Sequence, residues 1–162
     1  MAFSQRKPNR LNEYDYSQNG AYFVTICTQD RNKILSSIVG DGSPVPNPCG
    51  RIAEKMIAQI PVKYPSVSVD QYVIMPDHIH LLLRFNLDLG TGNPSPTLGT
   101  VIGWYKYQVT KLVNERMNTQ GEKFFQRSYY DHMIRSQQDY DEIWQYIENN
   151  PQKWIMQKNN LG

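Results

Sequence analysis

Runs of alternating apolar and polar residues, separated by stretches rich in glycine and proline, divide the chain into short strands and longer amphipathic segments. Residues 20–28 are rich in β-branched and aromatic side chains, which predicts a first strand. Two further runs, residues 67–75 and 78–85, are separated only by a Pro-Asp pair, which predicts a hairpin of two strands. Residues 124–135 are aromatic and extended in character, which predicts a last strand.

Helical spacing of apolar residues occupies the intervals between these strands. The first helix is predicted from about Gly50 to Ile60, ended by the prolines of residues 61–65. Thr97 is a candidate N-cap for a second, longer helix. The apolar face of that helix is formed by Leu98, Val101, Ile102, Tyr105, Val109 and Leu112.

A third helix is predicted at the C-terminal end. Ser136 with Asp139 resembles a capping box, with Asp in place of Glu, and opens a helix that runs through Asn150. Pro151 is expected to stop this helix or to begin the tail. Residues 40–48 and 88–96 are rich in Gly, Pro and Asn, and both segments are predicted to be loops.

The order of the elements is therefore strand, helix, strand, strand, helix, strand and a final helix. It predicts an α+β fold with a ferredoxin-like βαββαβ antiparallel sheet and an additional C-terminal helix. With 162 residues, the chain is long enough for one domain and too short for two. We expect residues 1–162 to form a single domain, with a basic N-terminal arm over residues 1–13 and a short tail over residues 155–162.

Composition narrows the class of protein further. No apolar run approaches the roughly 18 residues that a membrane span requires, so no membrane partner is expected. The N-terminus has no apolar segment behind its charges, which argues against a secretory signal and favours a cytoplasmic protein. Cys27 and Cys49 have no paired spacing and are expected to be reduced. A net charge of +2 does not by itself indicate a nucleic-acid binder.

Local clusters of basic and aromatic residues are more suggestive. Arg6, Lys7 and Arg10 lie within five residues near the start of the chain. Lys106 is the first of several basic residues along the second predicted helix. The alternative to a nucleic-acid contact is that these residues simply form the face of the helix that is exposed to water. The chain also has eleven tyrosines, whose rings can stack on unpaired bases, although most are expected at the edge of the core.

Two histidines in the second hairpin strand form the strongest chemical pattern. Side chains two residues apart in a strand point to the same face, so His78 and His80 are expected to project together while Ile79 packs into the core. Two neutral imidazoles on one rigid face form half of a divalent-metal site. The alternative is one buried, hydrogen-bonded histidine and one surface histidine.

The third predicted helix supplies a candidate nucleophile. Its buried stripe is formed by Tyr140, Ile143, Trp144 and Ile147. Tyr146 is placed roughly 110° from the middle of that stripe, with Asn150 one turn further along the same flank. A tyrosine and an amide oxygen should therefore emerge together at the edge of the packed face. The alternative is a boundary tyrosine with its hydroxyl in water.

Three blocks together resemble the REP-associated tyrosine transposases. These blocks are Met75-Pro76 with the histidine pair, residues 125–135, and residues 146–151. The family consists of single-tyrosine HUH nucleases related to the transposases of the smallest bacterial insertion sequences. The resemblance spans about residues 14 to 154. It is carried by blocks in the right order and spacing, which is more specific than any one motif.

The resemblance implies roles for particular residues. His78 and His80 would bind a divalent metal, Mg²⁺ or Mn²⁺, with Asn150 as a third ligand, and Tyr146 would attack a DNA phosphodiester. Asp77 stands where many relatives have Asn, and in a regular strand its side chain should point away from the metal face.

The chemistry implied is DNA nicking and joining by transesterification in DNA transposition. The substrate would be single-stranded hairpin DNA of the REP type, and the intermediate a covalent 5′-phosphotyrosine. A monomer and a homodimer are both compatible with the resemblance. A domesticated protein that binds hairpin DNA without cutting it is the alternative function. Two-histidine phosphoesterases need two His-x-Ser/Thr motifs, which this chain lacks.

Other residues are candidates for DNA contact. They are Arg6, Lys7, Arg10, Lys106, Tyr129, Tyr130 and His132. For His132, a structural or hydrogen-bonding role is the main alternative, and it is not assigned to the metal. Tyr129 and Tyr130 could stack on bases or fill the core, and because they are neighbours in an alternating strand, one of them is expected to do each.

Overall fold

A computed structural model describes residues 20–86 and 96–161, and the side chains of these residues up to Asn150. The proposed basic arm at the N-terminus and almost all of the loop at residues 88–96 lie outside the described residues. Four strands form the main antiparallel sheet, in the order β4-β5-β1-β6. These strands are β1 (Gly20–Cys27), β4 (Val67–Ile74), β5 (His78–Phe85) and β6 (Tyr130–Met133).

Two helices connect the strands in the ferredoxin-like manner. Helix α1 (Pro48–Lys63) lies between β1 and β4, and helix α2 (Leu98–Met117) lies between β5 and β6. The central strands β1 and β5 have the outer strands β4 and β6 as neighbours, which is the arrangement that a split βαβ sequence produces. The predicted fold class is thus confirmed. Among the described helices, none has the length and apolar character needed to cross a bilayer.

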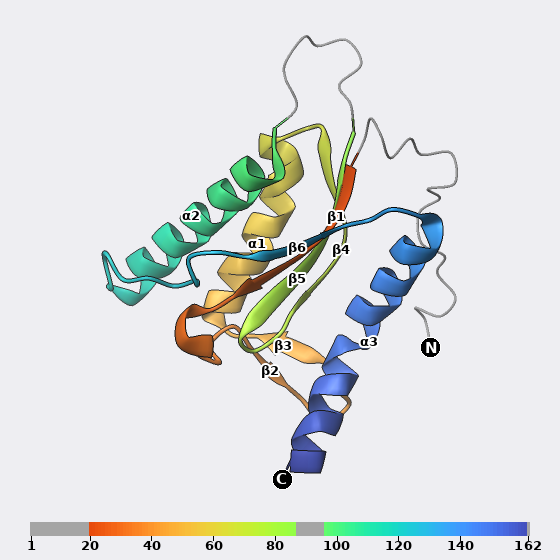
Figure 1. Ribbon diagram of the computed structural model, residues 1–162. Helices are drawn as coiled ribbons and strands as arrows, with labels where there is room; N and C mark the ends of the chain where they lie inside the picture. Colours follow the sequence, from red (N-terminus) through yellow and green to blue (C-terminus); the bar gives the residue numbers. More distant parts are fainter. Residues whose placement is uncertain (1–19, 87–95, 162) are drawn as a thin grey trace.

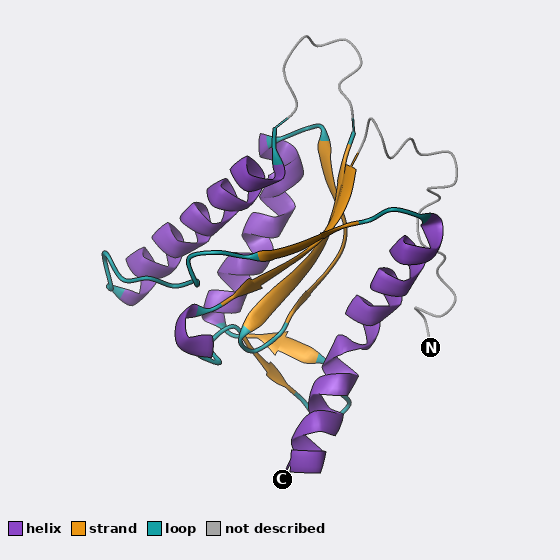
Figure 2. Cartoon of the chain, viewed as in Figure 1, coloured by secondary structure: helices purple, strands orange, loops and turns teal. Residues whose placement is uncertain are grey.

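The two faces of the sheet are covered differently (Figures 1 and 2). Helices α1 and α2 pack on one face, where they bury a core that includes Ile79 and Leu81 of β5. Helix α3 (Gln137–Leu161) crosses the opposite face, where a smaller core forms around Leu82 and Trp144. Because strand side chains alternate between faces, each central strand contributes to both cores. The face under α3 is the one that receives the histidines.

Two proline predictions were wrong. Helix α1 begins at Pro48 and continues through Pro61 to Lys63, rather than running from Gly50 to Ile60. Helix α3 likewise continues past Pro151 to Leu161, where a stop was expected. An internal proline removes one backbone hydrogen bond and crowds the preceding turn. In α1 that cost falls in the last turn, which Tyr64 closes with a hydrogen bond from its N–H to the Ile60 carbonyl.

The segment predicted as a loop at residues 40–48 contains structure. Strand β2 (Ser36–Ile38) pairs with β3 (Pro44–Pro46) in a small separate hairpin. Prolines are tolerated in β3 because it is a short edge strand of a two-stranded sheet. Ser36 also donates a hydrogen bond from Oγ to the Ile74 carbonyl, at 2.9 Å, which ties this hairpin to the end of β4.

The predicted N-cap residues of the second and third helices, α2 and α3, are confirmed. The Thr97 hydroxyl accepts a hydrogen bond from the N–H of Thr100, at 3.1 Å. The Ser136 hydroxyl accepts one from the N–H of Asp139, at 3.1 Å. The Asp139 carboxylate does not close the box on Ser136 and instead accepts from the N–H of Arg135. This carboxylate therefore anchors the chain entering α3.

Candidate active site

His78 and His80 lie at the start of β5, on the face of the sheet under α3. Both side chains are buried, and their ring centroids are 4.6 Å apart. Ile79 between them is fully buried in the opposite core. The sequence-based prediction that the histidines share one face while Ile79 packs behind them is confirmed.

Asp77 fixes the orientation of His78. The Asp77 carboxylate lies 2.7 Å from His78 Nδ1. Its other oxygen accepts a hydrogen bond from Arg31 Nε at 3.2 Å and forms an ion pair with one Nη of Arg31, also at 3.2 Å. The prediction that Asp77 points away from the metal face was wrong. Strand β5 begins only at His78, and Asp77 belongs to the preceding turn, so strand alternation does not govern it.

The segment that follows β1 holds the turn that carries Asp77. The N–H and the hydroxyl of Thr28 both donate to the Asp77 carbonyl, at 3.0 and 3.1 Å. Asp30 and Arg31 follow with positive φ angles of 58° and 53°. Such left-handed backbone is uncommon outside glycine. It reverses the chain at this point, and the Arg31 side chain binds the Asp77 carboxylate.

The charges in this group are set by burial and pairing. Burial alone would raise the pKa of Asp77, but hydrogen bonds from His78 and Arg31 outweigh it, so the pKa lies below its ordinary value. Burial lowers the pKa of His78. Burial, with a smaller contribution from His78, lowers the pKa of His80 to about 3. Both imidazoles are therefore neutral near pH 7, which is the form that binds metals.

His80 presents one nitrogen into the site. Its Nδ1 is hydrogen-bonded to the Thr25 hydroxyl at 2.9 Å. Its Nε2 is buried and has no hydrogen-bond partner among the described residues. A buried polar atom without a partner is costly and calls for an explanation, such as a missing ion or water. A metal at Nε2 would provide one.

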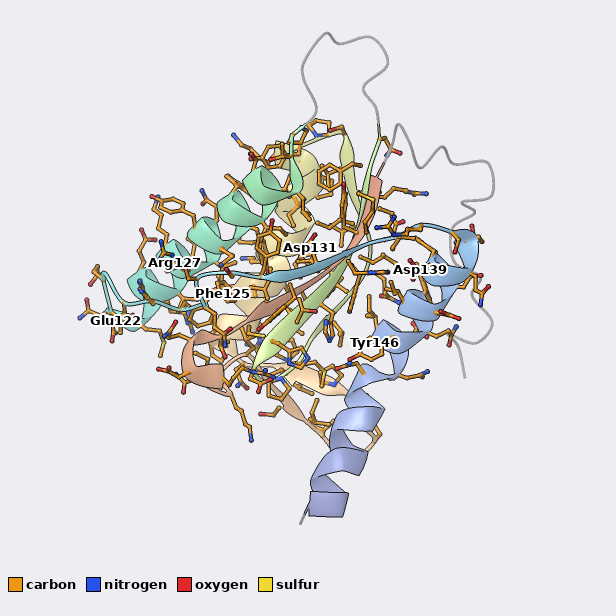
Figure 3. The ribbon with its side chains drawn as sticks, in the orientation of Figure 1. Glu122, Phe125, Arg127, Asp131, Asp139 and Tyr146 are labelled. Carbon is orange, nitrogen blue, oxygen red and sulfur yellow. The ribbon has the colours of Figure 1, made fainter. Side chains whose placement is uncertain are left out.

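Tyr146 and Asn150 come to the same place from α3. The Tyr146 ring lies 5.5 Å from the His80 ring and 5.8 Å from the Phe23 ring, measured between centroids. Its side chain is 39% exposed, so it stands at the edge of the packed face as predicted (Figure 3). Asn150, one turn later, is buried, and its side chain hydrogen-bonds to His78.

The donor set fits a hard divalent ion only in part. Within the described part of the chain, no three His, Cys, Asp or Glu side chains gather closely enough to hold a metal. Two imidazoles and one amide group lie together, from His78, His80 and Asn150, and Asn150 is hydrogen-bonded to His78. Such an open set suits a metal that keeps water or substrate oxygens among its ligands. The residues present therefore fit an ion that is completed by the substrate.

The remaining described candidates have different surroundings. His132 is hydrogen-bonded to Asp139, with Nε2 to Oδ2 at 2.9 Å, which is the structural alternative considered for it. Lys106 donates from Nζ to the carbonyls of Gln126, Arg127 and Ser128, at 2.7, 3.0 and 3.3 Å. A DNA contact by Lys106 stays a prediction, and it would compete with these three bonds.

Of the two neighbouring tyrosines, one packs against the core as expected, and base stacking by the other stays a prediction. Tyr129 is half-buried and packs against the larger core, while Tyr130 is 68% exposed. The sequence reasoning did not single out Arg31, Thr25 or Phe23. A signal existed for Thr25 only, because a polar residue interrupts the apolar run of the first strand. Arg31 gave no signal, because its contact with Asp77 depends on the backbone reversal at residues 30–31.

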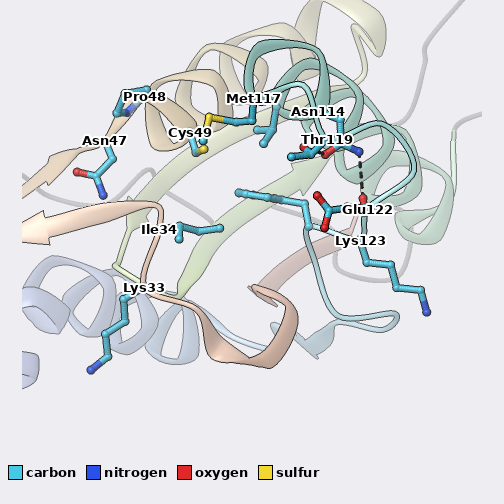
Figure 4. A pocket seen from close by; sticks show the side chains of 12 residues that line it. Lys33, Ile34, Asn47, Pro48, Cys49, Asn114, Met117, Thr119, Glu122 and Lys123 are labelled. Carbon is cyan, nitrogen blue, oxygen red and sulfur yellow. Dashed lines mark hydrogen bonds between the residues drawn. The ribbon is translucent and has the colours of Figure 1, made fainter.

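A cavity elsewhere in the molecule does not belong to this site. It has a volume of about 500 Å³ and lies where the start of α1 approaches the end of α2 (Figure 4). Its lining includes Cys49, Met117 and Phe124 and none of the residues of the candidate site. The candidate site lies instead on the face of the sheet under α3.

The comparisons with known proteins agree with this arrangement. The family model described as "Transposase IS200 like" matches residues 16–150. The chain therefore belongs to the IS200-like transposase family. In this chain, a histidine pair on a central strand lies beside a tyrosine on a helix.

Individual relatives make the placement more specific. The chain is 28% identical over 148 residues to a Haemophilus influenzae protein named "Putative REP-associated tyrosine transposase", covering 86% of this chain and 74% of that protein. It is 32% identical over 164 residues to an uncharacterised protein of the same organism, covering 92% of this chain and 89% of that protein. The fold is similar to that of a REP-associated tyrosine transposase solved with a REP hairpin, with a TM-score of 0.55 and 18% identity, covering 83% of this chain and 67% of that chain.

Proposed function

We propose that this transposase cuts and joins single-stranded hairpin DNA of the REP type through a covalent bond to Tyr146, with a divalent metal held by His78, His80 and Asn150. The observation that carries the proposal is the buried, unpartnered Nε2 of His80 beside the exposed edge of Tyr146. A nucleophile and a free metal-binding atom on one face are what a phosphodiester attack requires. The named Haemophilus relative and the hairpin-bound structure support the choice of substrate.

The bound ion would polarise the scissile phosphate and offset charge on the leaving 3′ oxygen. Tyr146 supplies the attacking oxygen from the edge of α3. The bond from its hydroxyl oxygen to phosphorus forms as the bond from phosphorus to the 3′ oxygen breaks. The hydroxyl proton leaves to solvent and the 3′ oxygen takes one up, so no external energy source is needed. A second 3′-OH can reverse the step, which joins two strands.

The residues around the metal ligands hold them in place. Asp77 accepts from His78 Nδ1, and Asn150 also hydrogen-bonds to the His78 side chain. Thr25 bonds to His80 Nδ1, so Nε2 is the His80 nitrogen left for a ligand. Phe23 packs against both His80 and Tyr146 and keeps the two rings at a fixed separation. Orientation of this kind allows a phosphate to be attacked in line.

The test of the nucleophile is formation of a covalent protein–oligonucleotide band on a denaturing gel. Tyr146→Phe should abolish the band and retain DNA binding, because the ring still packs beside Phe23 while the attacking oxygen is gone. Tyr107→Phe is a matched control, since Tyr107 is 63% exposed on α2 and should keep full activity. A band of normal intensity with Tyr146→Phe would refute the assignment.

The metal and the substrate are tested in the same assay. His78→Ala, His80→Ala and chelation by EDTA should each remove the band, and Asn150→Ala should raise the metal concentration needed. Hairpin DNA with an unpaired flank should be cut, whereas a perfect duplex should not, because opening it costs roughly 1.4 kcal/mol per base-pair step. Binding of the hairpin without any covalent band in Mg²⁺ or Mn²⁺ would favour the non-cleaving alternative.

A further inference from the structure

The exposed edge of the sheet beside the histidines carries one aromatic ring that the proposed chemistry leaves without a role. Strand β6 is an edge strand, and all four of its residues are exposed. Tyr130, its first residue, is 68% exposed, which is a large exposure for a tyrosine in a sheet. An exposed aromatic ring beside a nucleic-acid site is a natural surface for base stacking.

The strand register places this ring on the same face as the site. Thr25 of β1 is paired with His80 on one side and with Tyr130 on the other. Directly paired residues of antiparallel strands share a face, so His80, Thr25 and Tyr130 form one row across three strands. Neighbouring strands are about 4.8 Å apart, which separates the backbones of Tyr130 and His80 by about 10 Å.

The register also separates Tyr130 from the acidic side chain that follows it in the chain. The neighbouring acid Asp131, labelled in Figure 3, is paired with Val24 of the opposite core and so belongs to the other face. Its carboxylate does not lie between Tyr130 and the histidines.

The backbone that leads to Tyr130 is held rigidly. Lys106 bonds to three successive carbonyls, those of residues 126–128. The N–H of Gln126 donates to the Cys27 carbonyl at 2.9 Å, and Phe125 forms a bridge with Thr28. The segment before β6 is thus fixed to the end of β1, and little ordering is needed when a ligand meets the ring.

We propose that Tyr130 is the stacking platform for the unpaired base next to the scissile phosphate, on the strand beyond β1 from the histidines. The inference rests on the proposed function and adds a subsite to it. Tyr146 packs from α3 on His80 of β5 and Phe23 of β1, and Tyr130 lies on the next strand, β6. A single strand whose phosphate sits at the histidines would then extend its neighbouring base over β6.

The test measures binding in the Tyr146→Phe background, in EDTA, so that cleavage and metal play no part. The probes are a hairpin with an unpaired flank, the same hairpin without the flank, and a set of flanked hairpins with one abasic position each. Tyr130→Ala should weaken binding of the flanked hairpin roughly 5- to 150-fold, the range of one base stack. Tyr130→Phe should bind as the parent does, and Tyr107→Ala serves as the exposed-tyrosine control.

The abasic series identifies the base that stacks. At one flank position, removing the base should weaken the parent and leave Tyr130→Ala unchanged, because both changes remove the same contact. An equal loss on the flankless hairpin, or a loss no larger than that of Tyr107→Ala, would overturn the inference. So would a parent that binds neither hairpin. Normal flank binding without any covalent band in the active parent would refute the proposed cleavage and leave the subsite standing.

Discussion

Asp77 offers the sharpest test of how the site is organised. Its carboxylate is bonded to His78 Nδ1, and it also holds Arg31. Asp77→Ala would leave a buried imidazole nitrogen and a guanidinium without this partner. Loss of such an outer partner typically costs 10- to 100-fold in metal affinity. Since 1.4 kcal/mol corresponds to tenfold, the expected cost is about 1.4 to 2.8 kcal/mol.

Asp77→Asn separates the hydrogen bond from the charge. The amide oxygen can still accept from His78 Nδ1, while Arg31 loses its ionic partner, so a loss of less than about tenfold is expected. The assay is a titration with Mn²⁺, followed by the electron paramagnetic resonance signal of the free ion. Asp41→Ala is the control, because Asp41 is exposed and its carboxylate bonds to Ser43, within its own turn and far along the chain from the histidines. Equal Mn²⁺ affinity for Asp77→Ala and Asp41→Ala would refute this reasoning.

Three further predictions concern acid stability, the Lys106 contacts and the basic arm. The pKa of His80 falls from 6.5 in a free chain to about 3 in the fold, so the unfolded state binds the extra proton and metal-free stability should decrease as pH drops from about 6.5 toward 3. Denaturant titrations at several pH values should show a flatter dependence for His80→Asn, and an unchanged profile would contradict it. Lys106→Met should lower the free energy of unfolding by about 1.5 to 3 kcal/mol, since it removes charged hydrogen bonds to three carbonyls, whereas exposed Lys111→Met should change it little. Replacing Arg6, Lys7 and Arg10 by Ala should weaken hairpin binding and reduce its salt dependence without slowing covalent attachment at saturating DNA, and a parent-like salt slope would exclude a phosphate contact by the arm.

The periodicity of the sequence was sufficient for the sheet and for the histidines. Strands that alternate between two buried faces leave a strong pattern, and that pattern placed His78 and His80 on one face correctly. Helical spacing also placed Tyr146 and Asn150 on one flank of α3. These predictions depend only on local geometry, which a sequence specifies directly.

The errors arose where tertiary contacts overrule local preference. Pro61 and Pro151 predict helix ends, yet both lie inside helices. For Pro61 the lost hydrogen bond falls in the last turn of α1, whose apolar face is buried against the sheet. Asp77 lies in a turn, where strand alternation does not apply. Its partner Arg31 is 46 residues away, and that pairing leaves no periodic trace.

Alternate residues of the short strand β5 have two separate roles. Its odd-numbered residues Ile79 and Leu81 maintain the core under α1 and α2, while its even-numbered residues His78 and His80 form the proposed metal site. Substitutions on one face can therefore alter the proposed site while leaving the main core unchanged. Substitutions on the other face can alter the core while leaving the proposed site unchanged. Insertion or deletion of one residue here would exchange the two sets, burying imidazoles in the core and turning isoleucine toward the substrate. Strand β5 should therefore tolerate substitutions better than insertions or deletions.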